Sequence, residues 1–226
     1  MGTWTIVLTN WRRLGLKAVM EKAVIWAEDF WFDFRYGTDT LRREKTVDPA
    51  VTSPNAANAL HYAPARSRYF RALMGRMVFP QGSVLVDVGC GKGKVVMMAM
   101  DYPFKKVVGI DFSDRLCKIA RNNIATYCAK TTRTNTTEIH VCDAADYAIA
   151  PEQNVFFLYD PFKEAVMQKF IGNLTESLER SPRCVWLIYY EPIAECRDVI
   201  ESKGRFVLSH QVHYLDKKGL IYERPA

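Results

Sequence analysis

Residues 84–93 read Val84-Leu85-Val86-Asp87-Val88-Gly89-Cys90-Gly91-Lys92-Gly93. A run of strand character leads into three glycines spaced two apart, and a helical pattern begins at once from Lys94. A strand that ends in a glycine turn and opens a helix presents bare backbone N–H groups, with the positive end of the helix, to a bound ligand. The segment therefore predicts an α/β domain with a ligand at this turn, although such glycines also serve simply to make a tight turn.

The spacing of the glycines separates two kinds of nucleotide site. A dinucleotide fingerprint is Gly-x-Gly-x-x-Gly, whereas here the third glycine comes one residue earlier and Asp87 stands two residues before the first. This Asp-x-Gly-x-Gly-x-Gly form resembles motif I of class I S-adenosylmethionine (SAM) methyltransferases. The resemblance implies SAM as cofactor, with Gly89, Gly91 and Gly93 near its methionine part and Asp87 among the cofactor-binding residues.

Two further acids end the next two predicted strands. Asp111 ends the strand 106–111, where a carboxylate can accept both hydrogen bonds of a ribose diol. Asp143 ends a third short strand, a position that faces the adenine amino group in the methyltransferase pattern. A lone Asp at a strand end is more often a helix N-cap or solvated, but three acids in register with a glycine loop favour a nucleoside site. The resemblance covers about residues 80–226 and implies that Asp111 holds the ribose and Asp143 the adenine.

The methyl acceptor is predicted from the end of a later strand, Phe157-Leu158-Tyr159-Asp160-Pro161-Phe162. It resembles the Asn/Asp-Pro-Pro-aromatic motif of amino-group methyltransferases with one proline missing. The resemblance implies that Asp160 orients the target amine and that Phe162 lines its pocket. Asp160 followed by proline fits a helix N-cap equally well, and both interpretations can hold.

A shorter segment, Tyr62-x-Pro64, resembles the Tyr-x-Pro segment of the seven-strand lysine methyltransferases that lack a SET domain. The resemblance implies that Tyr62 lies near the methionine end of the cofactor. An aromatic face beside a sulfonium contributes about 0.5–2 kcal/mol. The alternative is a tyrosine that packs on a loop proline.

Composition and charge are those of an ordinary globular α/β chain. The 226 residues suffice for one sizeable core. The net charge of +6 is local, since no acid occurs between Asp48 and Asp87 while four arginines do: Arg66, Arg68, Arg71 and Arg76. This arginine cluster suits a nucleic acid, an anionic membrane or an acidic protein, or it is one solvated helix face.

The six cysteines are scattered without a C-x-x-C pair, which is typical of a reducing compartment and predicts neither disulfides nor a metal site. No secretory signal and no uncharged apolar stretch of spanning length is visible. We therefore expect a cytoplasmic protein without a metal.

The N-terminal segment stands apart from the alternating core. Apolar residues from Leu16 to Phe34 recur at spacings of three and four, with acids opposite, and predict an amphipathic helix of about five turns. We expect its aromatic stripe to pack against the main domain or a second subunit; the alternative is a peripheral membrane contact, against which the acids near its end argue. Residues 36–60 are predicted to form a loop over the cofactor mouth. Residues 1–60 and 61–226 are expected to form the extension and the methyltransferase domain.

Strands and helices alternate from residue 83 onward, which predicts a doubly wound, mainly parallel sheet. A hairpin is expected at the end of the chain, with runs 205–214 and 220–223 around a loop that contains Gly219. The methyltransferase resemblance implies seven strands, with the last one inserted antiparallel.

The sequence predicts a SAM-dependent methyltransferase. The reaction that it favours is N-methylation of a protein lysine or another amine. A nucleic acid and a lipid head group are the alternative acceptors. A SAM-binding regulatory subunit without catalysis is the alternative outside enzymology.

Overall fold

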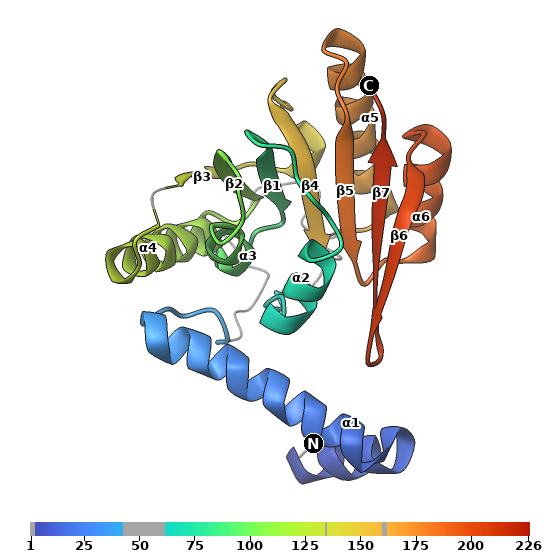
Figure 1. Ribbon diagram of the computed structural model, residues 1–226. Coiled ribbons are helices and arrows are strands. Elements are labelled where there is room, and N and C mark those ends of the chain that lie inside the picture. Colours follow the sequence, from blue (N-terminus) through green and yellow to red (C-terminus); the bar gives the residue numbers. More distant parts are fainter. Residues whose placement is uncertain (1–2, 43–61, 134, 160–161) are drawn as a thin grey trace.

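A computed structural model of the chain describes residues 3–42, 62–133, 135–159 and 162–226, with side chains from residue 17 onward. Seven strands form one sheet in the order β3-β2-β1-β4-β5-β7-β6 (Figure 1). Their bounds are β1 Val84–Val88, β2 Lys106–Asp111, β3 Thr136–Val141, β4 Gln153–Tyr159, β5 Val185–Tyr190, β6 Val207–Tyr214 and β7 Lys217–Arg224. Strands β1 to β5 pair in parallel, while β7 runs antiparallel to both β5 and β6. The predicted sheet, including the reversed last strand, is confirmed.

Helices cover both faces of this sheet (Figure 1). Their bounds are α1 Thr3–Tyr36, α2 Ser67–Met74, α3 Lys94–Ala99, α4 Asp114–Lys130, α5 Glu164–Arg180 and α6 Ala194–Asp198. Helix α6 continues into a π-helical turn, Val199–Lys203.

Alternate residues of each strand enter different cores, because successive side chains point to opposite faces. In β5, Leu187 and Tyr189 pack beneath α5 and α6. Ile188 and Tyr190 join the core beneath α2, α3 and α4. The strands are therefore packed on both faces, which holds in place the strand ends that carry the candidate site.

The C-terminal hairpin differs from the prediction in its turn. Its strands are joined by Leu215 and Asp216 alone, with Leu215 at a φ of 55°, and Gly219 lies within β7. A Cβ at Gly219 would stand 2.3 Å from Leu73 Cδ2. The glycine is therefore needed for the close approach of α2 to the sheet and not for a turn.

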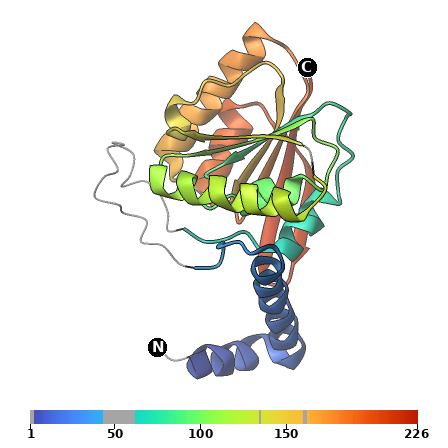
Figure 2. The ribbon, with the colours of Figure 1, turned by 90° about the vertical axis from the view of Figure 1, so that its left-hand side faces the viewer.

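Helix α1 leads away from the domain toward the N-terminus, as both views show (Figures 1 and 2). The side of α1 that faces the domain carries buried Ile25 and Asp29, and Phe32 and Tyr36 pack against Tyr127 of α4. The predicted stripe lies on the other side, with six large apolar residues between 45% and 68% exposed: Met20, Val24, Trp26, Phe30, Trp31 and Phe34.

The expectation that this stripe packs against the main domain is therefore wrong. Glu28 and Asp29 of α1 face the domain instead, where they meet Lys94 and the arginines at and before α2. The predicted boundary between residues 60 and 61 and most of the predicted loop 36–60 lie outside the described residues, so the domain division stays a prediction.

Among the residues that the structure describes, no helix is long and apolar enough to cross a membrane.

Candidate functional site

The glycine turn after β1 has a backbone that other residues rarely adopt. Gly89, Gly91 and Gly93 have φ angles of 81°, 52° and 79°, in the left-handed region that glycine enters at little cost. The N–H groups of Gly89 and Cys90 both donate to the carbonyl of Ile110 at 2.9 Å. The turn is thereby fastened to the end of β2, beside Asp111.

Asp111 ties the turn to the next helix. Its Oδ2 accepts the N–H of Gly91 and its Oδ1 the N–H of Ser113, each at 2.9 Å. Burial raises the pKa of Asp111 to about 6, against the opposing effect of these two hydrogen bonds. Each carboxylate oxygen keeps a further lone pair, so the group can still accept hydrogen bonds from a ligand.

Asp87 lies in β1, two residues before the turn, and its side chain is buried. Burial, with the charge of Asp111, raises the pKa of Asp87 well above its ordinary value. Asp87 nevertheless lines a cleft together with Gly89 and Cys90. A cation that enters this cleft would favour the ionised carboxylate.

The cleft holds about 280 Å³ of empty space, open solvent at its mouth included. Its described lining is Tyr62, Ala63, Pro64, Ala65, Asp87, Gly89, Cys90, Lys94, Val95 and Tyr159. The glycine turn forms one wall and the Tyr62–Ala65 segment that precedes α2 another. A tyrosine from the end of β4 completes it, so the cleft lies at the carboxyl ends of β1 and β4.

Tyr62 lies directly over the glycine turn. A Cβ at Gly91 would stand 2.4 Å from Tyr62 Cε2, and the Tyr62 hydroxyl donates to the carbonyl of Thr40 at 2.7 Å. The ammonium of Lys92 is 5.7 Å from the centre of the ring. Burial raises the pKa of Tyr62 well above its ordinary value, so the phenol stays protonated. Its predicted place near the turn agrees with this geometry; its role stays a prediction.

The remaining predicted residues are less closely associated with the cleft. Asp143 accepts the N–H of Ala145 at 2.9 Å and so caps a short 3-10 turn. The N–H of Cys142 donates to the carbonyl of Asp111 at 3.0 Å, which keeps the Asp143 loop beside the end of β2. Asp160 lies outside the described residues.

Phe162 differs from its expected position in the acceptor pocket. Its ring is buried in the core beneath α5, 6.4 Å from that of Phe170. The β4 ring that lines the cleft is that of Tyr159. The predicted role of Phe162 thus gains no support from its position.

A buried ion cluster beside the cleft was missed by sequence reasoning. The Asp29 carboxylate of α1 is fully buried and accepts from Lys94 Nζ at 2.6 Å, Arg66 Nη1 at 3.2 Å and the Ser67 hydroxyl at 2.7 Å. Burial alone would raise the pKa of Asp29, but Lys94 and the hydrogen bonds from Lys94 and Ser67 lower it. Because Lys94 also lines the cleft, α1 supports the cleft wall. The only signal in the sequence was an acid at an inward position of a helix.

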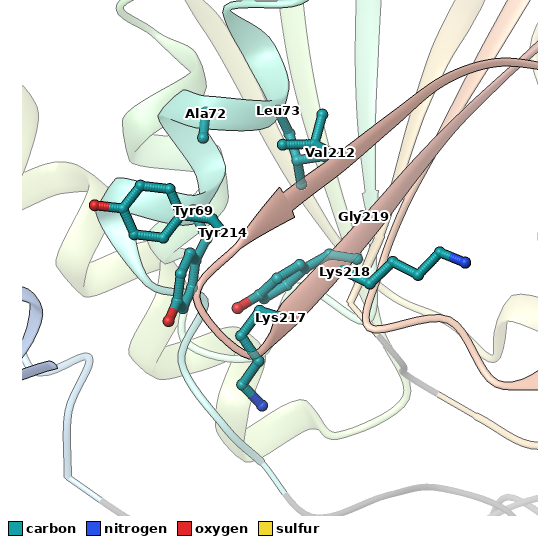
Figure 3. Close-up of a pocket in the computed structure, with 9 residues that line it drawn as sticks. Tyr69, Ala72, Leu73, Val212, Tyr214, Lys217, Lys218 and Gly219 are labelled. Carbon is teal, nitrogen blue, oxygen red and sulfur yellow. The ribbon is translucent and has the colours of Figure 1, made fainter. Parts of the chain in front are cut away.

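A second hollow lies beyond the cleft, between α2 and the C-terminal hairpin (Figure 3). Tyrosine rings connect the two, since Tyr159 contacts Tyr190 at 4.5 Å and Tyr190 contacts Tyr69 at 5.6 Å between centroids. Figure 3 shows Tyr69 and Tyr214 side by side at its edge, with Lys217 and Lys218 leaving β7 in different directions. The buried Tyr190 hydroxyl has no hydrogen-bond partner among the described residues.

The chain is similar to known methyltransferases in part of its sequence and in its fold. Residues 85–177 match the model of a methyltransferase domain family. The fold is similar to an RNA methyltransferase from Salinibacter ruber in complex with S-adenosyl-L-homocysteine, with a TM-score of 0.56 and 20% identity over 72% of this chain and 94% of that one. It is also similar to a SAM-dependent methyltransferase from Aquifex aeolicus, with a TM-score of 0.53 and 14% identity over 68% and 88% of the two chains. Residues 85–177 are thus similar in sequence to a methyltransferase domain, and the fold around them is that of class I SAM-dependent methyltransferases.

A curated relative matches over a shorter segment. The chain is 34% identical over 71 residues to the trans-aconitate 2-methyltransferase of Variovorax paradoxus, which is 31% of this chain and only 27% of that protein. The match therefore supports the methyltransferase assignment and leaves the acceptor open.

The residues around the cleft fit SAM, the cofactor of class I methyltransferases. The left-handed glycines leave no side chain over the turn, and Asp111 offers acceptor lone pairs beside it. The cationic amino-acid part of the cofactor would favour the ionised form of the buried Asp87 carboxyl. Among the described residues no cluster of three or more His, Cys, Asp or Glu side chains is arranged to hold a metal ion.

Proposed function

We propose that this methyltransferase transfers the methyl group of SAM to the nitrogen of an amine, a protein lysine side chain or a small amine. The observation that carries the proposal is the lining of the cleft, to which Tyr62 and Tyr159 contribute aromatic rings and Asp87 an acid. Aromatic faces attract alkylammonium and sulfonium groups by about 0.5–2 kcal/mol each. Apolar surroundings also lower the pKa of a bound amine, and only the neutral amine has a lone pair for attack.

SAM supplies an electrophilic methyl group: the carbon–nitrogen bond forms as the carbon–sulfur bond breaks, its electron pair stays on sulfur, and the nitrogen releases its proton to water. The protein lowers the barrier of such an in-line displacement mainly by alignment and by excluding water. Tyr62 and Tyr159 would exclude water from the cleft. Asp160, which lies outside the described residues, would accept a hydrogen bond from the amine, as its motif implies.

The arginine cluster supports an amine over a nucleic acid. Arg66 pairs with Asp29, and Arg68 and Arg71 both pair with Glu28 of α1. Helix α1 thus provides two acids where the sequence has none between residues 48 and 87, and these acids pair with three of the four arginines of the cluster. Nucleic acid remains the second candidate acceptor and a lipid head group the third.

The acceptor class is tested by incubating the protein and methyl-labelled SAM with cell extract, followed by protease, nuclease or organic solvent. Label that is removed by protease, or that is found in small amines, supports the proposal. Label that is removed by nuclease or extracted into solvent overturns it. A chain that binds SAM but labels no acceptor indicates a regulatory subunit.

The cofactor assignment is tested separately by calorimetry. Asp111→Ala should abolish measurable SAM binding, because it removes the acceptor beside the turn and frees the Gly91 N–H. Asp146→Ala is the matched control, since this exposed acid lies on the neighbouring turn. Unchanged affinity of the Asp111 variant would reject the assignment. Asp160→Ala should instead lower kcat and leave SAM affinity unchanged.

A further inference from the structure

The apolar side of α1 faces away from the domain, which is the reverse of an ordinary amphipathic helix on a globular core. Within residues 17–36, the exposed residues are Lys17, Met20, Ala23, Val24, Trp26, Ala27, Phe30, Trp31, Phe34 and Arg35. All of them are apolar except the two basic residues near the ends. At about 100° of rotation per residue the apolar ones cover an arc of about 160°. An apolar helix face of this width is normally buried.

Three of the four acids of the same segment have partners on the inner side, and Glu21 is half-buried. Asp29 is buried in the ion cluster with Lys94, and Glu28 pairs with two arginines of α2. The Asp33 carboxylate accepts from the hydroxyls of Thr38 and Thr40 at 2.7 and 2.8 Å. The outer face of α1 therefore has no exposed acid among its described side chains. The acids that argued against membrane contact in the sequence would not meet the lipid.

We propose that α1 docks through this outer face on an anionic lipid bilayer and lies in the plane of its interface. Trp26, Trp31 and the phenylalanines would enter the boundary between head groups and acyl chains, where aromatic side chains are favoured. Lys17 and Arg35 would meet anionic head groups on either side of them.

A second copy of the chain fits this face less well. In an antiparallel pair of α1 helices, Lys17 of one copy would approach Arg35 of the other, and in a parallel pair each basic residue would approach its equivalent. Neither arrangement offers an acid across the contact, whereas anionic lipid neutralises both cations. Charge complementarity therefore selects the bilayer.

The ion pairs on the inner side of α1 also hold its outer face in place. The guanidinium of Arg66 lies 3.7 Å over the centre of the Trp26 ring while it pairs with Asp29. The same ions that fasten α1 to the domain thus orient a tryptophan of the docking face. Little ordering remains to be done on contact, which favours binding.

Vesicle flotation tests the proposal with the whole chain. We expect the protein to float with vesicles of phosphatidylcholine that contain about one third phosphatidylglycerol, at least about tenfold more weakly with phosphatidylcholine alone, and less with added salt. The triple variant Phe30→Gln, Trp31→Gln, Phe34→Gln should lose binding by at least about tenfold. Its thermal unfolding and SAM affinity should not change, because these side chains are exposed.

Two further variants separate the contributions. Val78→Gln with Val207→Gln changes exposed apolar residues outside α1, which are 94% and 66% exposed, and should float like the wild type. Lys17→Gln with Arg35→Gln should reduce the preference for anionic lipid. Failure of the wild type to float overturns the proposal, and so does a triple variant that floats equally well. A lipid-free dimer that the triple variant dissociates would assign the face to a second copy.

Discussion

The sheet and helix α1 use their apolar residues in opposite ways. In the sheet, apolar side chains are buried, and Asp87 near the end of β1 lines the cleft. In α1, the charged side faces the domain through Asp29, while Phe34 and its neighbours remain exposed. A helix can therefore be held by a few well-paired ions, which leaves its apolar face for another surface.

The largest expected effect tests the ions under α1. Asp29→Ala leaves Lys94 buried without its partner and should cost about 3–5 kcal/mol of unfolding free energy, measured by urea denaturation. Glu28→Ala removes a partly exposed acid from the adjacent position and should cost at most about 1 kcal/mol. Equal costs would contradict the buried ion pair as the attachment of α1.

A pair of phenylalanines tests the contrast in burial directly. Phe157 is fully buried in β4, 5.4 Å from the ring of Phe70, and Phe157→Ala should cost about 3–5 kcal/mol. Phe34→Ala removes the same ring from an exposed position and should change stability by no more than about 0.5 kcal/mol. Denaturant midpoints of the two variants provide the comparison. A large loss for Phe34→Ala would mean that α1 is buried in solution.

Two of the buried carboxylates, Asp111 and Asp29, should respond to pH with opposite signs. The folded pKa of Asp111, about 6, lies above the ordinary value of 3.8, so the folded state binds the extra proton and stability falls as pH rises from about 4 to 6, by on the order of 3 kcal/mol. Asp29 has a lowered pKa, so its contribution is present at higher pH and is lost as pH falls below about 4. Unfolding free energies at a series of pH values measure both, and Asp111→Asn should lessen the fall between pH 4 and 6, to which Asp87 contributes with the same sign. A profile unchanged by that substitution would rule out the Asp111 contribution.

The last comparison sets a glycine before β1 against one in the glycine turn. Gly82→Ala adds a side chain at a φ of 86° with nothing within 4 Å, so it should cost only the backbone strain of about 1–2 kcal/mol. Gly91→Ala adds a clash with Tyr62 to a similar strain, and should also weaken SAM binding at least about tenfold. Calorimetry distinguishes the two variants. Equal SAM affinities would show that Gly91 and Tyr62 do not contribute to the cofactor site.

The sequence predicted the features that depend on residues close to one another along the chain. The glycine turn and Asp111 follow one another closely along the chain, so their spacing already described a site. Periodicity identified the apolar stripe of α1 but could not tell which side meets the domain, because Lys94 lies 65 residues from Asp29.

The same limit applies to single residues. Gly219 was predicted to be a turn residue, because the sequence does not show the contact with Leu73 of α2 that requires a glycine there. Tyr159 was passed over for Phe162, since the motif gave residue types and not the direction of the ring. These details depend on contacts between distant segments, which spacing along the chain does not encode.

Lys94 belongs both to the wall of the cleft and to the ion cluster around Asp29. A chain trimmed to the segment 85–177 that the family model matches would keep this ammonium and lose its counter-ion, together with Tyr62. Such a fragment would therefore have a misfolded or altered cofactor site, even though it contains every motif glycine. Experiments on catalysis should retain the N-terminal helix, and transplanting this domain onto another scaffold would require carrying the helix along.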